Sequence, residues 1–330
     1  MPSRRCLGAV FAAVALGLST GTAAAQTAGY PYVDRNCGVE NTYTAPPQRA
    51  VTLSNNASEL LIALGLQERM VGTSYMAALQ ISGQYKAVYD KIPILSPLVA
   101  TTEQLIAAQA DFVYAGYPDG FAPALHTRDQ LQALGMKTRL NTEGCNLGAV
   151  TFETLYDEIR TVAAIFGVPE RGRALVADIS TRLAAVQKAL AGRKPIPVLI
   201  YNGGEAAPAA ALGNSMLSQI VAQAGGVNIF ADVANRFGNV SWEQVVAREP
   251  QYVVVYYSGT EAGQVVKDPA TQLGQGRVAI LKAQPAIRDV PAIKNQKFVL
   301  LDSVLAQPGP SNIDAVERLA RAFHPEAFTK

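Results

Sequence analysis

Short runs of β-branched and other apolar residues alternate with helical patterns along most of this chain of 330 residues. The runs expected to form strands are 49–54, 70–75, 111–115, 136–140, 198–201, 252–257 and 298–301. The helical patterns that follow or separate them are 58–65, 102–108, 127–134, 215–224, 241–248 and 312–323. Strands that alternate with helices at this spacing favour parallel sheets covered on both faces. The sequence therefore predicts an α/β fold with mostly parallel sheets.

The alternation stops once, in the middle of the chain, where residues 151–167 and 169–191 are both helical with no strand between them. The second pattern keeps its apolar residues on one helical face, at Leu175, Ile179, Leu183, Val186 and Leu190. A long helix between two βα regions predicts two Rossmann-like lobes joined by a single long helix. The expected divisions are an N-terminal lobe at 26–150, a helical segment at 151–194 and a C-terminal lobe at 195–330.

The N-terminus has the pattern of a secretory signal peptide. Arg4 and Arg5 precede the uncharged run LGAVFAAVALGL, and small residues follow up to Ala25. The run is too short to span a bilayer, which takes about 20 apolar residues. We therefore expect residues 1–25 to be removed by cleavage near Ala25. The mature protein is expected to be exported to the periplasm, without membrane insertion.

The charge balance excludes several classes of partner. The chain has 28 basic and 26 acidic residues, and removal of Arg4 and Arg5 leaves equal numbers. A balanced chain with no basic excess is not expected to bind nucleic acid. No global electrostatic field would attract a ligand, so any selectivity must come from charges placed locally.

Two cysteines remain after the signal peptide, Cys37 and Cys145. An exported protein meets an oxidising environment in which disulfides persist, so we expect these two to pair. The alternative is a pair of unrelated buried thiols.

The second half of the chain repeats a segment of the first. TEQLIAAQADFVYAGY, from Thr102, aligns without gaps on WEQVVAREPQYVVVYY, from Trp242, and both copies carry Glu-Gln at their second and third positions. Thr101 is expected to cap the first helix, with Gln104 at the capping-box position. The two glutamates, Glu103 and Glu243, either share a function in the two lobes or merely suit a helix N-terminus.

Catalytic and metal-binding patterns are poorly represented. The chain has only two histidines, and it contains no G-x-S-x-G elbow, Walker phosphate loop or G-x-G-x-x-G fingerprint. We therefore expect no enzyme activity, no catalytic residues, no resident metal and no cofactor.

Tyrosines recur where the predicted strands end. Ligands of open α/β sheets collect at the carboxyl ends of the strands. Tyr75, Tyr117, Tyr201 and Tyr257 stand at such ends in both lobes. We expect them to line an aromatic, hydrogen-bonding cleft together with Trp242, with Arg236 as a cation for an anionic ligand. The alternative is that each tyrosine is structural and Arg236 a solvated loop residue.

Most of the chain resembles a known family. The segments PPQRAVTLSNNASELLIALGLQERMVGTSY, EQLIAAQADFVYA, AGGVNIFAD and VSWEQVVAREPQYVVV are similar to the substrate-binding proteins that serve ABC importers of ferric siderophores, haem and vitamin B12. This resemblance implies two lobes bridged by one rigid helix, a ligand in the shallow cleft between them, and a monomer. It also implies that Glu103 and Glu243 dock onto arginines of the membrane permease. One departure is Ser311, where relatives often carry arginine.

The sequence thus predicts a periplasmic protein that captures a metal chelate, a ferric siderophore in the first place, and delivers it to an ABC permease. The alternatives are a haem- or corrinoid-binding protein of the same family, or a sensor or exported enzyme on the same α/β frame.

Overall fold

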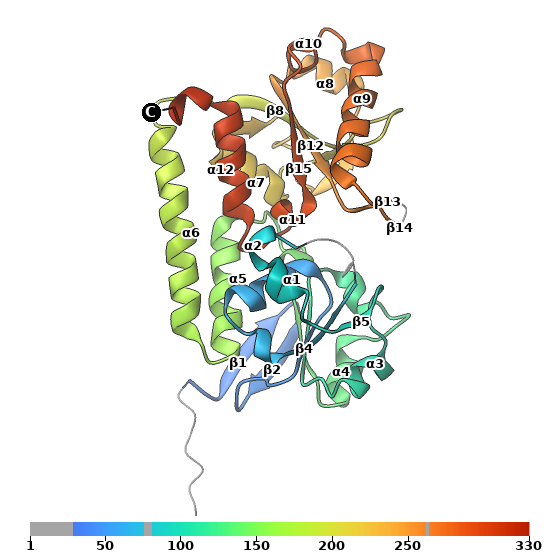
Figure 1. The fold of residues 1–330 in the computed structure, drawn as a ribbon, viewed down its shortest axis with the longest axis vertical. Coiled ribbons are helices and arrows are strands. Elements are labelled where there is room, and N and C mark those ends of the chain that lie inside the picture. The colour runs from blue at the N-terminus through green and yellow to red at the C-terminus, as the bar shows by residue number, and fades with distance from the viewer. Residues whose placement is uncertain (1–28, 76–80, 262–263, 330) are drawn as a thin grey trace, which may run out of the picture.

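The computed structural model of the protein describes residues 29–75, 81–261 and 264–329. Within these ranges the chain forms two α/β lobes, one above the other in Figure 1, with two helices running along one side. The expected signal peptide lies outside the described residues.

The N-terminal lobe is built on a parallel sheet of five strands in the order β5-β4-β3-β6-β7. Its central strand, β3, is completely buried, as expected for a parallel sheet covered on both faces. The strands are β3 (Ala50–Thr52), β4 (Met70–Ser74), β5 (Ile94–Ser96), β6 (Phe112–Ala115) and β7 (Lys137–Leu140).

The helices of this lobe are α1 (Asn55–Ala63), α2 (Gly83–Tyr89), α3 (Thr102–Ala107) and α4 (Arg128–Ala133), with short 3-10 turns at η1 (Gln67–Arg69), η2 (Pro118–Phe121) and η3 (Thr142–Cys145). Helix α1 begins three residues earlier than the sequence pattern indicated, because Ser54 is in extended conformation and forms its N-cap. An antiparallel hairpin, β1 (Tyr32–Asn36) and β2 (Val39–Tyr43), precedes the sheet and was not anticipated.

The middle of the chain forms two helices, α5 (Phe152–Ile165) and α6 (Pro169–Ala189), which lie side by side. The long α6 begins with proline at its first position, where no backbone donor is lost. It packs against α5 of the lower lobe in Figure 1 and continues upward beside α12 (Asn312–Phe323) of the other lobe. The predicted long helix between the lobes is thus present.

The C-terminal lobe has a mixed sheet of six strands. Its path is β11-β9-β8-β12-β15, and β10 pairs with β8 beside that path. The pairings among β8, β10, β12 and β15 are parallel. At one edge, β9 pairs antiparallel with β8, and β11 pairs antiparallel with β9. The strands are β8 (Ile196–Gly203), β9 (Ala209–Ala211), β10 (Gly226–Asn228), β11 (Phe237–Asn239), β12 (Tyr252–Tyr257) and β15 (Phe298–Asp302).

The remaining elements of this lobe surround the sheet. The α-helices are α7 (Met216–Gln223), α8 (Trp242–Ala247), α9 (Gly276–Ala283), α10 (Pro291–Lys294), α11 (Ser303–Ala306) and α12. A small hairpin, β13 (Thr260–Glu261) and β14 (Gln264–Val265), leads into a π-helical turn, η4 (Ala270–Gln275), and two short 3-10 turns follow at η5 (Pro285–Ile287) and η6 (Pro325–Ala327).

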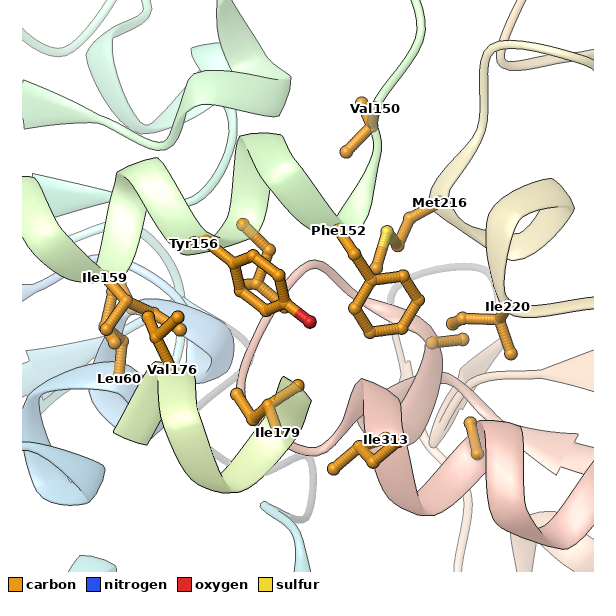
Figure 2. Packing of buried hydrophobic residues seen from close by; sticks show 14 of the residues in the cluster. Leu60, Val150, Phe152, Tyr156, Ile159, Val176, Ile179, Met216, Ile220 and Ile313 are labelled. Atoms are coloured by element: carbon orange, nitrogen blue, oxygen red, sulfur yellow. The ribbon is translucent and has the colours of Figure 1, made fainter. Parts of the chain in front are cut away.

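One continuous apolar core crosses from lobe to lobe behind the sheets. Phe152 and Tyr156 of α5, Ile179 of α6, Met216 of α7 and Ile313 of α12 belong to it. Figure 2 shows these side chains gathered between the helices. Because interiors of this kind are close-packed, this junction resists large opening motions between the lobes.

The segment that is repeated in the sequence forms the same helix–strand unit in both lobes. α3 and β6 in one lobe correspond to α8 and β12 in the other. Both helices begin with a complete capping box, Thr101 with Gln104 and Ser241 with Gln244. Two further residues at the same offset, Gln109 and Glu249, share the left-handed backbone conformation with φ of 52° and 44°.

Candidate functional site

A cavity of about 230 Å³ lies between the lobes, beside the carboxyl ends of β6 and β12. The N-terminal lobe contributes Tyr117 and Glu143. The C-terminal lobe contributes the other lining residues: Ser215, Met216, Leu217, Arg236, Phe237, Tyr256, Ala306, Gln307 and Pro308. This position, at the strand ends and between two lobes, is where open α/β sheets bind their ligands.

Aromatic side chains line both sides of this cavity. Tyr117 follows β6 and is the N-cap residue of the short turn η2, whereas Tyr256 is the second-last residue of strand β12. The Phe237 ring, 45% exposed, lies 6.2 Å from the Tyr256 ring, with 33° between their planes. Burial raises the pKa of both tyrosines, so their hydroxyls keep their protons at neutral pH and can donate hydrogen bonds.

An ion pair crosses the cavity from lobe to lobe. Arg236 lies between β10 and β11, and Glu143 lies in η3. The Arg236 Nη1 atom donates to the Glu143 backbone carbonyl at 3.0 Å and lies 3.7 Å from its Oε1 atom. The Glu143 side chain is only 8% exposed, and burial raises its pKa to about 7, although the charge of Arg236 acts in the opposite direction.

The loop that carries Glu143 is fixed from several sides. Cys145 forms the expected disulfide with Cys37, in the turn between β1 and β2. The Thr142 hydroxyl donates to the buried carboxylate of Glu158, and the Asn141 side chain donates to the Tyr114 hydroxyl at 3.3 Å.

The structure places the residues predicted for the cleft in different environments. Tyr117 and Arg236 line the cavity together. Tyr75, directly after β4, is not among the lining residues. Its hydroxyl donates a hydrogen bond to Asp119 Oδ2 at 2.6 Å. Because Asp119 follows Tyr117 by two residues, Tyr75 lies near the lining residue Tyr117.

Tyr201 and Trp242 require a correction, because both belong to the core of the C-terminal lobe. Strand β8 continues to Gly203, so Tyr201 is inside the strand and completely buried. Its ring packs 6.2 Å from that of Trp242, which is 6% exposed, and the indole N–H donates to the Glu205 carbonyl. Neither side chain faces the cavity.

Tyr257 also lies outside this cavity. Adjacent residues of a strand point to opposite faces, so Tyr256 faces the space between the lobes and Tyr257 does not. Tyr257 instead lines a separate cavity of about 240 Å³ within the C-terminal lobe, together with Lys267, Asp268 and Asp302.

Most of the lining residues were not among the predicted site residues, and Glu143, Phe237 and Tyr256 are the ones that matter most for binding. Glu143 follows the predicted strand at 136–140, so the rule that ligands collect at strand ends would have found it if that loop had been included. Tyr256 was beside the residue chosen, and the register of β12 decides between the two. Phe237 had no signal, because its short edge strand is irregular in sequence.

Glu103 and Glu243 occupy equivalent positions at the exposed starts of α3 and α8. Figure 1 shows these helices in opposite lobes, near the two ends of the molecule. Hydrogen bonding to the Thr101 hydroxyl lowers the pKa of Glu103. Hydrogen bonding to its own backbone N–H and to Ser241 lowers that of Glu243. Both side chains are therefore anionic at neutral pH.

Ser311 lies at the junction of the lobes rather than in the cavity. Its backbone N–H donates to the buried Glu59 Oε1 atom of α1 at 2.9 Å. Burial raises the pKa of Glu59 to about 7, against the hydrogen bonds from Ser311 and Ser82 that lower it.

Comparison with known proteins identifies the family. The sequence model of a family described as periplasmic binding protein matches residues 51–305. The chain therefore belongs to the periplasmic binding protein family, whose members bind small molecules and work with ABC permeases. Within the described residues, none of the helices combines the length and the apolar character needed to cross a membrane.

Two of the relatives are named for binding vitamin B12 or cobalamin. A vitamin B12-binding protein of Salmonella typhimurium is 30% identical over 226 residues, which are 68% of this chain and 76% of that protein. A cobalamin-binding protein of Halobacterium salinarum is 23% identical over 294 residues, 86% of this chain and 71% of that protein.

Solved structures confirm the fold. A periplasmic binding protein from Veillonella parvula superposes with a TM-score of 0.79 at 25% identity, covering 89% of this chain and 97% of that one. An Fe3+-hydroxamate transport system structure from Saccharomonospora viridis superposes with a TM-score of 0.69 at 26% identity, covering 89% and 99%.

Proposed function

We propose that this protein is exported to the periplasm, captures a corrinoid of the vitamin B12 class in the cavity between its lobes, and delivers it to an ABC permease. The observation that carries the proposal is the lining of the cavity, which is aromatic and carries one internally balanced charge pair. The vitamin B12-binding and cobalamin-binding relatives support the same ligand class.

The charge of the cavity changes the order of the candidate ligands. From the sequence, a ferric siderophore is the first candidate, and Arg236 is expected to compensate the charge of an anionic chelate. In the structure Arg236 faces Glu143, so an ionised Glu143 carboxylate compensates its charge within the protein. A large ligand without net charge, which offers flat apolar surface and amide groups, suits aromatic rings and tyrosine hydroxyls.

The volume of the cavity limits how the ligand would bind. Sites that enclose drug-sized molecules measure roughly 300–1,000 Å³, and this cavity of about 230 Å³ is smaller. The apolar junction behind the cavity opposes wide opening. A corrinoid would therefore insert one edge between Tyr117 and Phe237 and leave the rest of its ring system at the mouth.

Calorimetric titration of the mature protein with cyanocobalamin tests this proposal. We expect saturable binding with one site, and we expect Phe237→Ala to weaken it by about tenfold, the loss typical of a buried aromatic contact. Val246→Ala is the matched control, because Val246 is similarly exposed on α8 of the same lobe but does not line the cavity. Absence of cobalamin binding, or equal binding by both variants, would contradict the proposal.

A ferric siderophore remains the second candidate. The structure from Saccharomonospora viridis, named for Fe3+-hydroxamate transport and 26% identical, supports it. An uncharged ferric trihydroxamate would suit the balanced cavity for the same reason as a corrinoid. If the protein bound such a chelate in preference to cyanocobalamin in the same calorimetric series, the ferric siderophore would become the first candidate and the corrinoid the second.

We further propose that Glu103 and Glu243 dock onto basic residues of the permease. Their support is geometric, since two exposed carboxylates stand at equivalent positions in the two lobes. Paired charges of this kind direct the orientation of an encounter and raise its rate.

Charge reversal separates docking from ligand capture. The double variant Glu103→Lys/Glu243→Lys should abolish uptake in cells and leave ligand affinity unchanged. Glu153→Lys is the matched control, because Glu153 is an exposed glutamate at the same helical position in the capped helix α5. Unchanged uptake by the double variant would refute the docking role and favour a sensor function.

A further inference from the structure

The ion pair in the cavity joins two residues that are 93 positions apart and belong to different lobes. Arg236 retains 27% of its side-chain exposure, whereas Glu143 retains 8%. The guanidinium is thus the partner that a ligand can reach, and the carboxylate lies behind it. This arrangement leaves a cation at the surface of the cavity with an anion directly beside it.

These two residues are the only charged ones that line the cavity among the described residues. Tyr117 and Tyr256 stay protonated at neutral pH, because burial raises the pKa of both. The sign of the electrostatic potential inside the cavity therefore depends on how fully Glu143 cancels Arg236. Removal of either charge would leave the other uncompensated in a site with few polar atoms, where charges interact more strongly than in water.

Three neighbouring charged residues have partners of their own or line other cavities, and the charges of Asp302 and Arg277 act on the pKa of Tyr256 in opposite directions. Glu158 lines a small adjoining cavity with Glu143, but it is held by Arg139 at 2.7 Å. Arg277, behind the end of β12, donates to the Tyr256 carbonyl and to Asn202. Asp302 lines the second cavity with Tyr257 rather than the cavity between the lobes.

We propose that Glu143 is a specificity-determining residue, which neutralises Arg236 and so makes the site select uncharged metal chelates over anionic ones. The inference rests on the proposed function, because it assumes that the ligand binds in this cavity. It goes further in assigning selection against anionic ligands to a carboxylate of the N-terminal lobe. Rejection by an unfavourable charge is a common way to obtain specificity.

The fixed position of Glu143 supports this role. The disulfide at Cys145 and the hydrogen bond from Thr142 to Glu158 hold the loop on both sides of it. A carboxylate on a mobile loop would turn away when an anion approached, and the pair would then attract anionic ligands through Arg236. A fixed carboxylate cannot do so without disturbing the lobe.

The experiment compares two ferric chelates by calorimetry at pH 8, above the pKa of about 7 to which burial raises Glu143. One is an uncharged ferric trihydroxamate and the other an anionic ferric tris-catecholate, with cyanocobalamin as a third ligand. Glu143→Gln keeps the shape of the side chain and removes its charge. Glu153→Gln removes one exposed carboxylate outside this cavity and is the matched control.

We expect Glu143→Gln to bind the tris-catecholate about tenfold more tightly than the wild-type protein, with little change for the uncharged ligands. Arg236→Gln should weaken binding of the tris-catecholate, and Glu143→Gln/Arg236→Gln should return its affinity towards that of the wild type. Glu153→Gln should change neither. These expected changes in affinity depend on the charge of the ligand. If Glu143 had only a structural role, Glu143→Gln would change the affinity for all three ligands alike.

The outcomes distinguish this inference from the proposed function. If the wild-type protein binds uncharged ligands and Glu143→Gln leaves the discrimination unchanged, the inference alone is overturned. If the wild type binds ferric trihydroxamate but not cyanocobalamin, and Glu143→Gln relaxes the discrimination, the corrinoid assignment fails and the inference stands. If the wild-type protein prefers the tris-catecholate, both are overturned.

Discussion

In the N-terminal lobe, covalent and buried ionic contacts hold the segment that carries Glu143, whereas in the C-terminal lobe the segment that carries Arg236 and Phe237 is held by strand pairing. Arg139 lies at the centre of the first arrangement, 2.6 Å from Asp34 and 2.7 Å from Glu158, with all three side chains at least 96% buried. In the second, β11 pairs with β9, and the Leu212 N–H donates to the Arg236 carbonyl at 2.8 Å.

The two halves of the cavity therefore contribute different properties to ligand binding. The N-terminal half places one carboxylate with little freedom, which suits a residue that selects by charge. The C-terminal half presents the Phe237 ring on the short edge strand β11 and the Tyr256 ring on the inner strand β12. Changes at the disulfide, at Arg139 and at Glu59 test whether the N-terminal lobe is the more firmly constrained half.

Removal of the disulfide should have the largest effect on stability. Cys37 and Cys145 are 108 residues apart, and closing a loop of that size is worth about 4–5 kcal/mol in the chain-entropy model. Cys37→Ala/Cys145→Ala should lower the free energy of urea unfolding by an amount of this order. In reducing buffer the wild type should lose its advantage over the variant. A loss below about 1 kcal/mol would show that the lobe does not depend on this bond.

Disruption of the buried ionic network should come next. Arg139→Met leaves the carboxylates of Asp34 and Glu158 buried without their partner, which costs about 3–5 kcal/mol. Arg248→Met is the control in the other lobe. There the guanidinium pairs with Asp232 at 2.6 Å, but the two side chains are 32% and 63% exposed, so a much smaller loss is expected. Equal losses in urea unfolding would remove the contrast between the lobes.

The smallest of the three effects concerns Glu59, at the junction of the lobes. Its pKa is about 7 in the folded protein and near 4.5 when unfolded, so the folded state binds more protons between these values. The contribution of Glu59 to stability should therefore be greatest below pH 4.5 and fall as pH rises towards 7, by at most about 1.4 kcal/mol per pH unit.

Glu59→Gln should reduce that slope, measured by urea unfolding at a series of pH values, while Glu143 continues to contribute in the same direction. The exposed Glu153→Gln serves as control and should leave the slope unchanged. A steeper slope in Glu59→Gln would show that the burial of Glu59 is not the cause of the pH dependence.

Much of the fold could be predicted because its signals are local. The capping boxes at Thr101 and Ser241, the proline at the start of α6 and the period of its apolar face all lie within a few residues of the elements they define. The hairpin β1–β2 was missed, since its alternation of side chains is short and polar. The early start of α1 was missed because Ser54 caps the helix through its backbone conformation and makes no side-chain hydrogen bond.

The candidate site was predicted only in part. Tyr117 and Arg236 line the cavity, and their contact with a ligand stays a prediction. Trp242 does not line it, because this first residue of α8 packs into the core of the C-terminal lobe. Tyr201 and Tyr257 do not, because a difference of one or two residues in where a strand ends or which face it presents changes where a side chain points. Sequence position alone does not settle that register.

The sequence by itself determined the alternation of the main helices and strands, the duplication of the α3–β6 unit as α8–β12, and the presence of two cysteines able to pair. All of these depend on neighbours in the chain or on residue type. Only the tertiary structure decided that Tyr256 rather than Tyr257 faces the cavity and that Glu143 meets Arg236 across the lobes. The reason is physical: the charge and shape of the cavity arise from residues that are distant in sequence, and only the packing of the two lobes brings them together.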